Sequence, residues 1–175
     1  MATKGRLKLN NFNPKHLALP LKLYKGMGLK IKKLSNSSYE IYCKTLKPIK
    51  KISTKEFPGY PTDLQAQLIA TQLKSGLKSK VVENIFENRF IHIPELRRFG
   101  ANLSIKGNTV TIDKTSNLLG AEVMATDIRA SFSLIIAAMM SKGKTVINRI
   151  YHLDRGYEDF DLKLKKCGVN ISRKK

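Results

Sequence analysis

Two stretches of sequence decide the fold, TDLQAQLIATQL at residues 62–73 and TDIRASFSLIIAAMM at residues 126–140. In each, a Thr-Asp pair precedes a long apolar run. Thr is a favourable N-cap, and an acidic residue in the first turn interacts well with the helix dipole. The pattern predicts helices over Leu64–Leu73 and Ile128–Met140, and the second, apolar on nearly every side, should be fully buried. Because the Thr-Asp pairs lie 64 residues apart, the sequence indicates an internal repeat.

The residues after each helix follow the same order in both copies. A β-rich stretch comes first, and a second, amphipathic helix follows it. Gly100 and Gly168 then stand where a helix C-cap needs a left-handed backbone conformation. The expected strands span residues 80–86 and 145–151, and the expected second helices span residues 94–99 and 158–167.

The first of these copies continues into a β-hairpin. Residues 102–105 and 109–112 read as strands, and Lys106-Gly107-Asn108 between them is a turn signal. The unit therefore reads helix, strand, helix, strand, with a further hairpin strand at its end and a short leading strand before it. This order predicts an α/β (α+β) fold.

A third, partial copy lies at the start of the chain. It has a strand, a second helix, a capping Gly28 and a hairpin, at residues 4–12, 16–24, 28 and 29–43. The first helix of the unit has no counterpart there. We therefore expect one domain over residues 1–175, with a partial repeat at 1–50 and repeats at 57–113 and 120–175. A unit that cannot cover its own sheet exposes apolar surface, so self-association or a partner that supplies the missing segment is expected.

The net charge raises a different hypothesis. The sequence carries 33 basic and 13 acidic residues, a net charge of +20, which is typical of many nucleic-acid-binding proteins. However, 25 of the basic residues are Lys, whereas specific phosphate and base recognition favours Arg. Residues 1–55 hold 14 basic residues and a single acid, Glu40. Solvated Lys side chains are the favoured interpretation, and no specific nucleic-acid partner is expected.

Other features of the sequence bear on its compartment. No run of about 18 apolar residues is present, so no transmembrane helix is expected. The first ten residues contain no signal-peptide core. Cys43 and Cys167 lie far apart, with neither metal-ligand nor redox spacing. We expect a reduced, cytoplasmic domain with no membrane partner.

Charged residues recur at equivalent ends of the repeats. Asp63 and Asp127 stand at predicted helix N-termini, and Arg129 follows in the first turn of its helix. Arg89 and Arg155 come just after the strand of their repeat. Because strand ends and helix starts at one edge of a sheet can converge, these five side chains are candidates for one site. Such a site suits a small, multiply anionic substrate and a hydroxyl that needs a general base.

Each of these residues also has a purely structural interpretation. Asp63 is equally suited to capping a helix or forming a salt bridge. Arg89 and Arg155 have carboxylates close by in sequence, Glu87 and Asp154. Packing within β-to-helix turns is the expectation for two histidines, His92 and His152. The sequence contains no Walker loop, dinucleotide-binding glycine motif, His/Cys cluster or Ser/His/Asp arrangement.

Four motifs resemble those of the UDP-N-acetylglucosamine 1-carboxyvinyltransferase family. They are PTDLQAQ at 61–67, IFENRF at 85–90 with His92 and PEL at 94–96 behind it, ATDIRAS at 125–131, and NRIYHLDRGYE at 148–158. The motifs occur in the family's order and cover roughly residues 57–171. Residues 1–56 are only weakly similar to the preceding family segment.

The resemblance implies transfer of enolpyruvyl from phosphoenolpyruvate to the 3′-hydroxyl of UDP-N-acetylglucosamine, the first committed step of peptidoglycan synthesis. It implies no cofactor. The implied fold has two inside-out α/β domains, each built from three βαβαββ-type units, and this chain resembles the C-terminal part with its first unit truncated. The implied roles are sugar binding and general base for Asp63, contact with the UDP-sugar for Ile85, a place beside the reacting centre for Asp127, and binding of phosphoenolpyruvate for Arg89, Arg129 and Arg155.

The sequence also departs from the family pattern. The family's other domain carries a mobile loop with a catalytic cysteine or aspartate, a further arginine and a Lys-Asn pair, none of which matches a segment here. Neither Cys43 nor Cys167 lies in a matching motif. We therefore expect the isolated chain to be inactive and to need the missing N-terminal catalytic domain. The alternatives are a 5-enolpyruvylshikimate-3-phosphate synthase-like fragment and a basic nucleic-acid-binding domain on a decayed enzyme fold.

Overall fold

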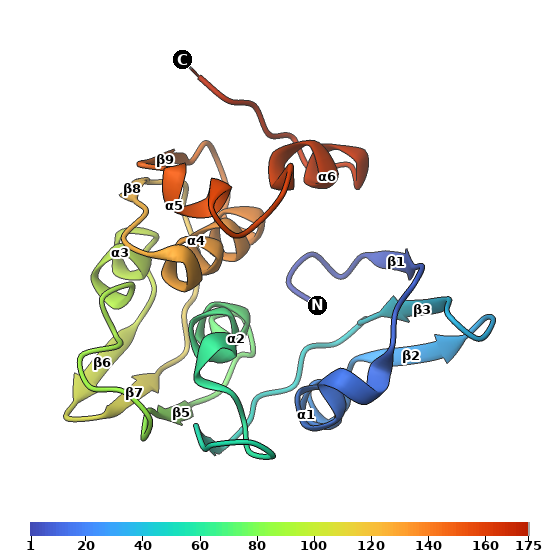
Figure 1. The fold of residues 1–175 in the computed structure, drawn as a ribbon. Helices are drawn as coiled ribbons and strands as arrows, with labels where there is room; N and C mark the ends of the chain where they lie inside the picture. Colours follow the sequence, from blue (N-terminus) through green and yellow to red (C-terminus); the bar gives the residue numbers. More distant parts are fainter. Residues whose placement is uncertain (175) are drawn as a thin grey trace.

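The structure is a computed structural model that describes residues 1–174, and three units follow one another along the chain (Figure 1). The second unit contains the whole pattern. Its elements are β4 (Lys51–Ser53), a 3-10 turn η2 (Thr62–Leu64), α2 (Gln65–Gln72), β5 (Ser79–Val82), α3 (Ile93–Arg98), β6 (Leu103–Lys106) and β7 (Thr109–Ile112).

The units on either side contain parts of the same pattern. The first consists of β1 (Arg6–Leu9), a 3-10 turn η1 (Pro14–Leu17), α1 (Ala18–Gly26), β2 (Lys30–Lys33) and β3 (Tyr39–Tyr42). The third consists of β8 (Glu122–Met124), α4 (Ile128–Met140), β9 (Val146–Asn148), α5 (Tyr151–Asp154) and α6 (Phe160–Lys166).

Strand pairing confirms that the units are copies of one another. The sheet of the second unit has the order β4-β5-β7-β6, with β4 and β5 parallel and the remaining pairs antiparallel. The first unit has the order β1-β3-β2, which is the arrangement of β5-β7-β6. The parallel pair β8-β9 of the third unit corresponds to β4-β5. The predicted α/β fold with βαβαββ-type repeats is therefore confirmed, and β4 lies where a short leading strand is expected before the second unit.

The main core lies between α2 and α4 and the elements around them. These two helices pack side by side in the middle of the molecule (Figure 1). Ile69 of α2 and Leu73, which caps its C-terminus, meet Leu134 of α4 in a cluster that also includes side chains of α3 and of strands β5, β6 and β7. Burial of each such side chain contributes about 1.5–3 kcal/mol. The sequence predicts complete burial of α4, but only part of it is buried, because Phe132, Ile136 and Met139 are half-buried.

The helix starts differ from the sequence prediction. Asp127, not Thr126, is the N-cap of α4, and its carboxylate accepts the N–H groups of Arg129 and Ala130. A carboxylate at this position satisfies two backbone donors that the helix leaves unpaired. Thr62 does not cap either, because its hydroxyl is hydrogen-bonded to Glu83 instead.

Both strands that follow the inner helices are shorter than predicted. β5 ends at Val82, because the Glu83 carboxylate accepts the N–H groups of Ile85 and Phe86 and closes a turn. β9 ends at Asn148, and the next residue, Arg149, has a φ of +57°, which takes the chain out of the strand. The predicted C-caps are confirmed: Gly100 and Gly168 have φ values of +83° and +89°.

The sheet of the first unit is only partly covered. Its strand register places Leu7, Ile41 and Ile31 in one row across β1, β3 and β2, and Leu7 is 43% exposed. Met27 at the end of α1 is buried against Tyr60 and Leu68, which joins this unit to α2. This apolar row is therefore partly exposed, because Leu7 is open to solvent while Ile31 and Ile41 are half-buried.

Two further expectations from the sequence concern membrane-spanning helices and the two cysteines. Among residues 1–174, no helix is both long enough and apolar enough to cross a membrane. Cys43 is buried and Cys167 is exposed, and both are free thiols.

Candidate anion-binding site

Three of the predicted site residues meet where α2 and α4 begin. Asp63 lies in η2, directly before α2, and Arg129 lies in the first turn of α4. The Arg129 Nε donates to Asp63 Oδ1 at 2.5 Å, and Arg89 Nη2 lies 3.5 Å from the same oxygen. Because α2 and α4 are equivalent helices of neighbouring units that pack together, the internal repeat itself brings these residues into contact.

Arg89 reaches this cluster from the loop between β5 and α3. Its guanidinium group stacks on the Phe86 ring, 4.4 Å from the ring centroid, and its Nη1 donates to Thr62 Oγ1 at 2.8 Å. The side chain is only 18% exposed, whereas that of Asp63 is 63% exposed. Arg89 is therefore held in place on several sides, and the carboxylate it faces is open to solvent. A hollow of about 490 Å³, lined by residues 86–91 and the β6–β7 turn, lies beside Arg89.

Asp127 and His92 take no part in the ion pairs of the cluster. Asp127 uses its carboxylate to cap α4, with distances of 2.7 Å and 2.9 Å to the N–H groups of Arg129 and Ala130. His92 is buried, as its expected packing role requires. Burial lowers the pKa of His92 to about 4, and the negative charge of Asp127 opposes this shift. His92 is thus a neutral side chain of the core at neutral pH.

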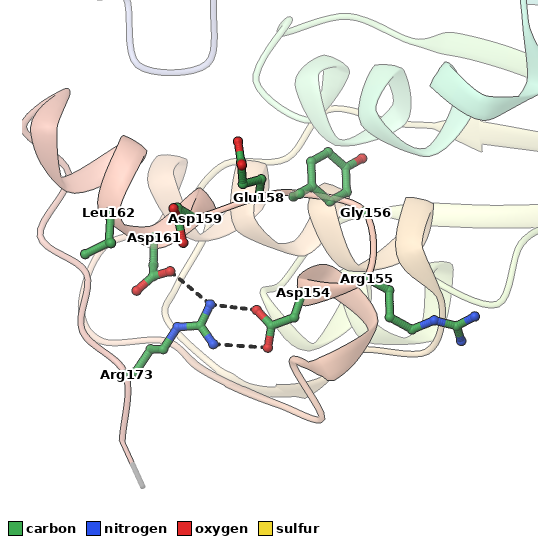
Figure 2. Close-up of a pocket in the computed structure, with 9 residues that line it drawn as sticks. Asp154, Arg155, Gly156, Glu158, Asp159, Asp161, Leu162 and Arg173 are labelled. Atoms are coloured by element: carbon green, nitrogen blue, oxygen red, sulfur yellow. Dashed lines mark hydrogen bonds and ion pairs between the residues drawn. The ribbon is translucent and has the colours of Figure 1, made fainter.

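The structure does not bring Arg155 into hydrogen-bonding or salt-bridge contact with the cluster within the part of the chain it describes. Its side chain is exposed, and Figure 2 shows it extending away from Asp154 and Arg173. Its backbone is nevertheless near α4, because a Cβ on Gly156 would lie 1.9 Å from the side chain of Ile128. Any larger residue at this position would force the Ile128 side chain at the start of α4 to move.

The same loop places Tyr157 beside the cluster. The Gln67 amide donates to the Tyr157 hydroxyl at 3.4 Å, and the Tyr157 ring stacks on Phe132 at 4.5 Å. Burial raises the pKa of Tyr157, while its hydrogen bond with Gln67 and the charge of Arg129 act in the opposite direction. Sequence reasoning missed Tyr157 and Gln67, although both lie inside motifs that it singled out.

Ile85 is half-buried in the loop that also carries Arg89. Its backbone N–H donates to the Glu83 carboxylate at 2.9 Å. Sequence reasoning also missed Glu83, which is buried between the ends of β4 and β5. The sequence does contain a signal for it, because Glu83 directly follows the apolar pair Val81-Val82 at the end of a strand. A charge that is buried at such a position needs an explanation.

The salt-bridge partners suggested by sequence proximity are not used. Arg89 pairs with Asp63 and not with Glu87. Asp154 pairs with Arg173, not with the adjacent Arg155. Asp63 is not a helix cap, so of its two structural interpretations only the salt bridge is confirmed.

A larger hollow, of about 760 Å³, surrounds the connection between α5 and α6 (Figure 2). Within it, Arg173 donates to Asp154 at 2.6 Å and to Asp161 at 2.9 Å. The Arg173 guanidinium also lies over the Phe160 ring. Because this guanidinium is already neutralised by two carboxylates, the hollow is less suited to an anionic ligand than the Asp63 cluster. Among the described residues, no group of His, Cys, Asp and Glu side chains is arranged to hold a metal ion.

The Asp63 cluster has a defined chemical capacity. Two guanidinium groups that share one carboxylate oxygen can also bind the oxygens of a small phosphate or carboxylate ligand. An exposed carboxylate between them can accept a proton from a hydroxyl group that lies within hydrogen-bond distance. Fold and site together define an α/β repeat protein with a candidate anion site where its inner helices α2 and α4 begin.

Comparison with known proteins identifies the family. The EPSP synthase (3-phosphoshikimate 1-carboxyvinyltransferase) family matches residues 1–164. The enolpyruvyl transferase NikO from Streptomyces tendae superposes with a TM-score of 0.84 over 95% of this chain and 40% of that chain, at 24% identity, which supports the fold. This chain therefore belongs to the enolpyruvyl transferase family.

Individual relatives are more similar in sequence. The UDP-N-acetylglucosamine 1-carboxyvinyltransferase of Pelagibacter ubique (strain HTCC1062) is 49% identical over 98% of this chain and 41% of the relative. The enzyme of the same name from Rhodopseudomonas palustris (strain TIE-1) is 57% identical over 70% of this chain and 28% of the relative. The chain thus spans about two fifths of the length of the first of these relatives.

Proposed function

We propose that this chain forms one side of the active site of a UDP-N-acetylglucosamine 1-carboxyvinyltransferase. The reaction is the transfer of enolpyruvyl from phosphoenolpyruvate to the 3′-hydroxyl of UDP-N-acetylglucosamine, with release of phosphate. One observation carries the proposal: Asp63 lies between the guanidinium groups of Arg89 and Arg129. The high identity to relatives with this enzyme name supports the choice of reaction.

The arginines act on phosphoenolpyruvate in this proposal. Arg89 and Arg129 bind its carboxylate and phosphate oxygens and stabilise the charge that develops as phosphate departs. Arg155 joins them when substrate is bound, and the close approach of Gly156 to Ile128 at the start of α4 supports this role. Asp127 orients the first turn of α4, and thereby the backbone of Arg129, beside the reacting centre.

Asp63 and Ile85 act on the acceptor sugar. Asp63 binds the 3′-hydroxyl and accepts its proton, for which its exposed carboxylate is accessible. When phosphoenolpyruvate takes over the donors of Arg89 and Arg129, Asp63 is released from its ion pairs and becomes free to act as the base. Ile85 provides an apolar contact for the UDP-sugar from the loop next to Arg89.

The remaining groups come from outside these residues. Because the chain spans about two fifths of its relatives' length, we propose that the competent assembly adds a segment carrying the acid that protonates the enolpyruvyl methylene. The apolar row of Leu7, Ile31 and Ile41, of which Leu7 is exposed and the two isoleucines are half-buried, is the surface proposed for docking of that segment, or for self-association in its absence. The proposed setting is the cytoplasmic stage of cell-wall synthesis, which supports cell shape and division.

Ligand titration of the chain, followed by arginine side-chain NMR, tests the proposal. Phosphoenolpyruvate should shift the Nε–H resonances of Arg89 and Arg129, and the shifts should disappear in Arg129→Gln. Arg98→Gln is a matched control, because Arg98 donates to a backbone carbonyl of Glu122 on the surface. No response of either resonance to millimolar phosphoenolpyruvate would contradict the proposal.

The acceptor is tested separately. UDP-N-acetylglucosamine should enhance phosphoenolpyruvate binding, whereas shikimate 3-phosphate should have no effect. The reverse preference would favour the 5-enolpyruvylshikimate-3-phosphate synthase-like alternative. Phosphate release by the isolated chain should remain at the background rate, because water is not excluded from a site enclosed on one side only.

A further inference from the structure

Glu83 is a buried carboxylate directly after β5, with 2% of its surface exposed. Its Oε1 accepts hydrogen bonds from Thr54 Oγ1 at 2.8 Å and from the Ile85 N–H at 2.9 Å. Its Oε2 accepts from Thr62 Oγ1 at 2.8 Å. A longer bond of 3.3 Å from the Phe86 N–H also reaches Oε1. All four partners can donate, which is the arrangement that the ionised, acceptor-only form of a carboxylate requires.

Stability alone does not account for a charge at this position. A buried carboxylate loses its hydration, and an apolar side chain of similar size often serves a core equally well or better. Among the described residues, no Lys, Arg or His forms a salt bridge with Glu83. What Glu83 does instead is join three segments, the end of β4 at Thr54, the turn after β5, and η2 at Thr62.

The Thr62 hydroxyl transmits the effect of Glu83 to Arg89. A hydroxyl has one hydrogen and two lone pairs. When its hydrogen points at Glu83 Oε2, a lone pair remains for Arg89 Nη1, which donates to Thr62 Oγ1 at 2.8 Å. The other terminal nitrogen of Arg89, Nη2, faces Asp63. Glu83 thus fixes the direction of a hydrogen-bond chain that ends at the candidate site.

The same carboxylate shapes the loop between Glu83 and Arg89. By accepting the N–H of Ile85 it closes the turn that ends β5, and it sets where Ile85 and the stacked pair of Phe86 and Arg89 lie. Two proposed substrate contacts, Ile85 and Arg89, therefore depend on one buried side chain that itself lies outside the Asp63 cluster.

We propose that Glu83 is a positioning residue, which holds Arg89 through the Thr62 hydroxyl in the orientation that binds the anion. The identity of that anion as phosphoenolpyruvate rests on the proposed function. The orientation of Arg89 does not, because it is a property of the free chain and can be measured without ligand.

Four single variants of the full chain separate positioning from general stability. Glu83→Gln keeps the shape but turns an N–H₂ group toward Thr62 or toward the backbone donors. Thr62→Val removes the hydroxyl that connects Glu83 to Arg89, and Thr62→Ser retains it. Thr54→Val is the matched control, because Thr54 is also buried and donates to Glu83, but to Oε1, whereas the hydroxyl that contacts Arg89 donates to Oε2.

Two readouts are used on each variant. Arginine side-chain NMR reports how fast the Arg89 guanidinium rotates about its Cζ–Nε bond, and calorimetry with phosphoenolpyruvate reports affinity. Glu83→Gln and Thr62→Val should speed this rotation and weaken binding about tenfold, as expected when one charge-assisted hydrogen bond is lost. Thr62→Ser should restore both, and Thr54→Val should lower the melting temperature while leaving both unchanged.

Slow rotation and wild-type affinity in both Glu83→Gln and Thr62→Val would overturn the proposal. If Glu83→Gln does not fold, the comparison of Thr62→Val with Thr62→Ser decides the same question. A wild-type chain that does not bind phosphoenolpyruvate, but whose Arg89 rotation responds to the variants as expected, would refute the proposed function and leave the positioning role supported.

Discussion

Asp63 and Arg129 lie 66 residues apart in the sequence and are joined by a hydrogen bond of 2.5 Å from Nε to Oδ1. Each belongs to the start of the inner helix of its own repeat, so the contact links two repeats at equivalent positions. Arg89 approaches the same carboxylate oxygen from the second repeat. The Asp63–Arg129 half of the candidate site is therefore a junction between repeats, which forms when α2 and α4 pack together, whereas Arg89 and Asp63 belong to the same repeat.

Asp63→Asn tests whether this carboxylate is a base or only an ion-pair partner. In an assembly competent for transfer, the rate should fall at least about a hundredfold, because the amide cannot accept the hydroxyl proton. The melting temperature should change little, because exposed ion pairs contribute about 0–1 kcal/mol. Asp113→Asn, which removes a surface pair with Lys78, is the control. A large loss of stability with normal turnover per folded molecule would show that Asp63 is structural.

His92 should make the stability of the chain depend on pH. Burial places its pKa at about 4 in the folded protein, below the value of about 6.5 for an exposed histidine. The unfolded chain therefore binds the proton more tightly, so the contribution is fully present above pH 6.5 and is lost as the pH falls toward 4. The full contribution of His92 to the free energy of unfolding is roughly 3 kcal/mol.

Denaturant unfolding at pH 7 and pH 5 measures this effect. The loss of stability between the two pH values should be smaller in His92→Gln than in the wild type. His152→Gln, at a half-buried histidine that stacks on Tyr151, should retain the wild-type difference. Equal pH dependence in His92→Gln and the wild type would mean that His92 is not buried in its neutral form.

Binding of DNA should be sequence-indifferent and should weaken steeply with salt. The strand register of the first unit places Arg6, Lys8, Lys30 and Lys32 on one face of its sheet. Arg6 already contacts Glu40 and stacks on Tyr42, so that ring is not free to stack with a base. Fluorescence anisotropy with two unrelated duplexes should give equal affinities that fall together as salt rises. A tight complex with one duplex only at about 0.15 M salt would instead support a nucleic-acid function.

A pair of glycines in the first unit should respond oppositely to alanine. A Cβ at Gly26 meets no atom within 4 Å, so Gly26→Ala should stabilise the chain by about 0.5–1 kcal/mol. Gly28 has a φ of +104°, and a Cβ there would lie 2.2 Å from the carbonyl oxygen of Thr45. Gly28→Ala should therefore destabilise by more than about 1 kcal/mol. Thermal unfolding of both variants measures whether the melting temperature rises for Gly26→Ala and falls for Gly28→Ala. An unchanged melting temperature in Gly28→Ala would show that the Thr45 carbonyl does not lie against Gly28.

Local patterns were sufficient for much of the fold. Apolar runs and glycine caps predicted the inner helices, the hairpin between residues 102 and 112, and the repeat itself, because periodicity and turn chemistry act over a few residues. The predicted end of β5 and the predicted N-cap of α4 were wrong, because both depend on which backbone N–H groups a carboxylate accepts in the folded chain. Glu83 and Asp127 each bind two backbone N–H groups, and neither outcome follows from propensity alone.

The sequence by itself determined the class of the protein, since its repeated Thr-Asp segments and its four motifs are continuous stretches of chain. It also named Asp63, Arg89 and Arg129 as residues that share a site. Only the tertiary structure decided that Arg89 pairs with Asp63 in preference to Glu87, that Arg155 stays apart, and that the buried Glu83 supports the cluster. The physical reason is that these partners are far apart in sequence and meet only in the folded chain: Thr62, Glu83 and Arg89 through the turns of the second repeat, and Asp63 and Arg129 through the packing of α2 against α4.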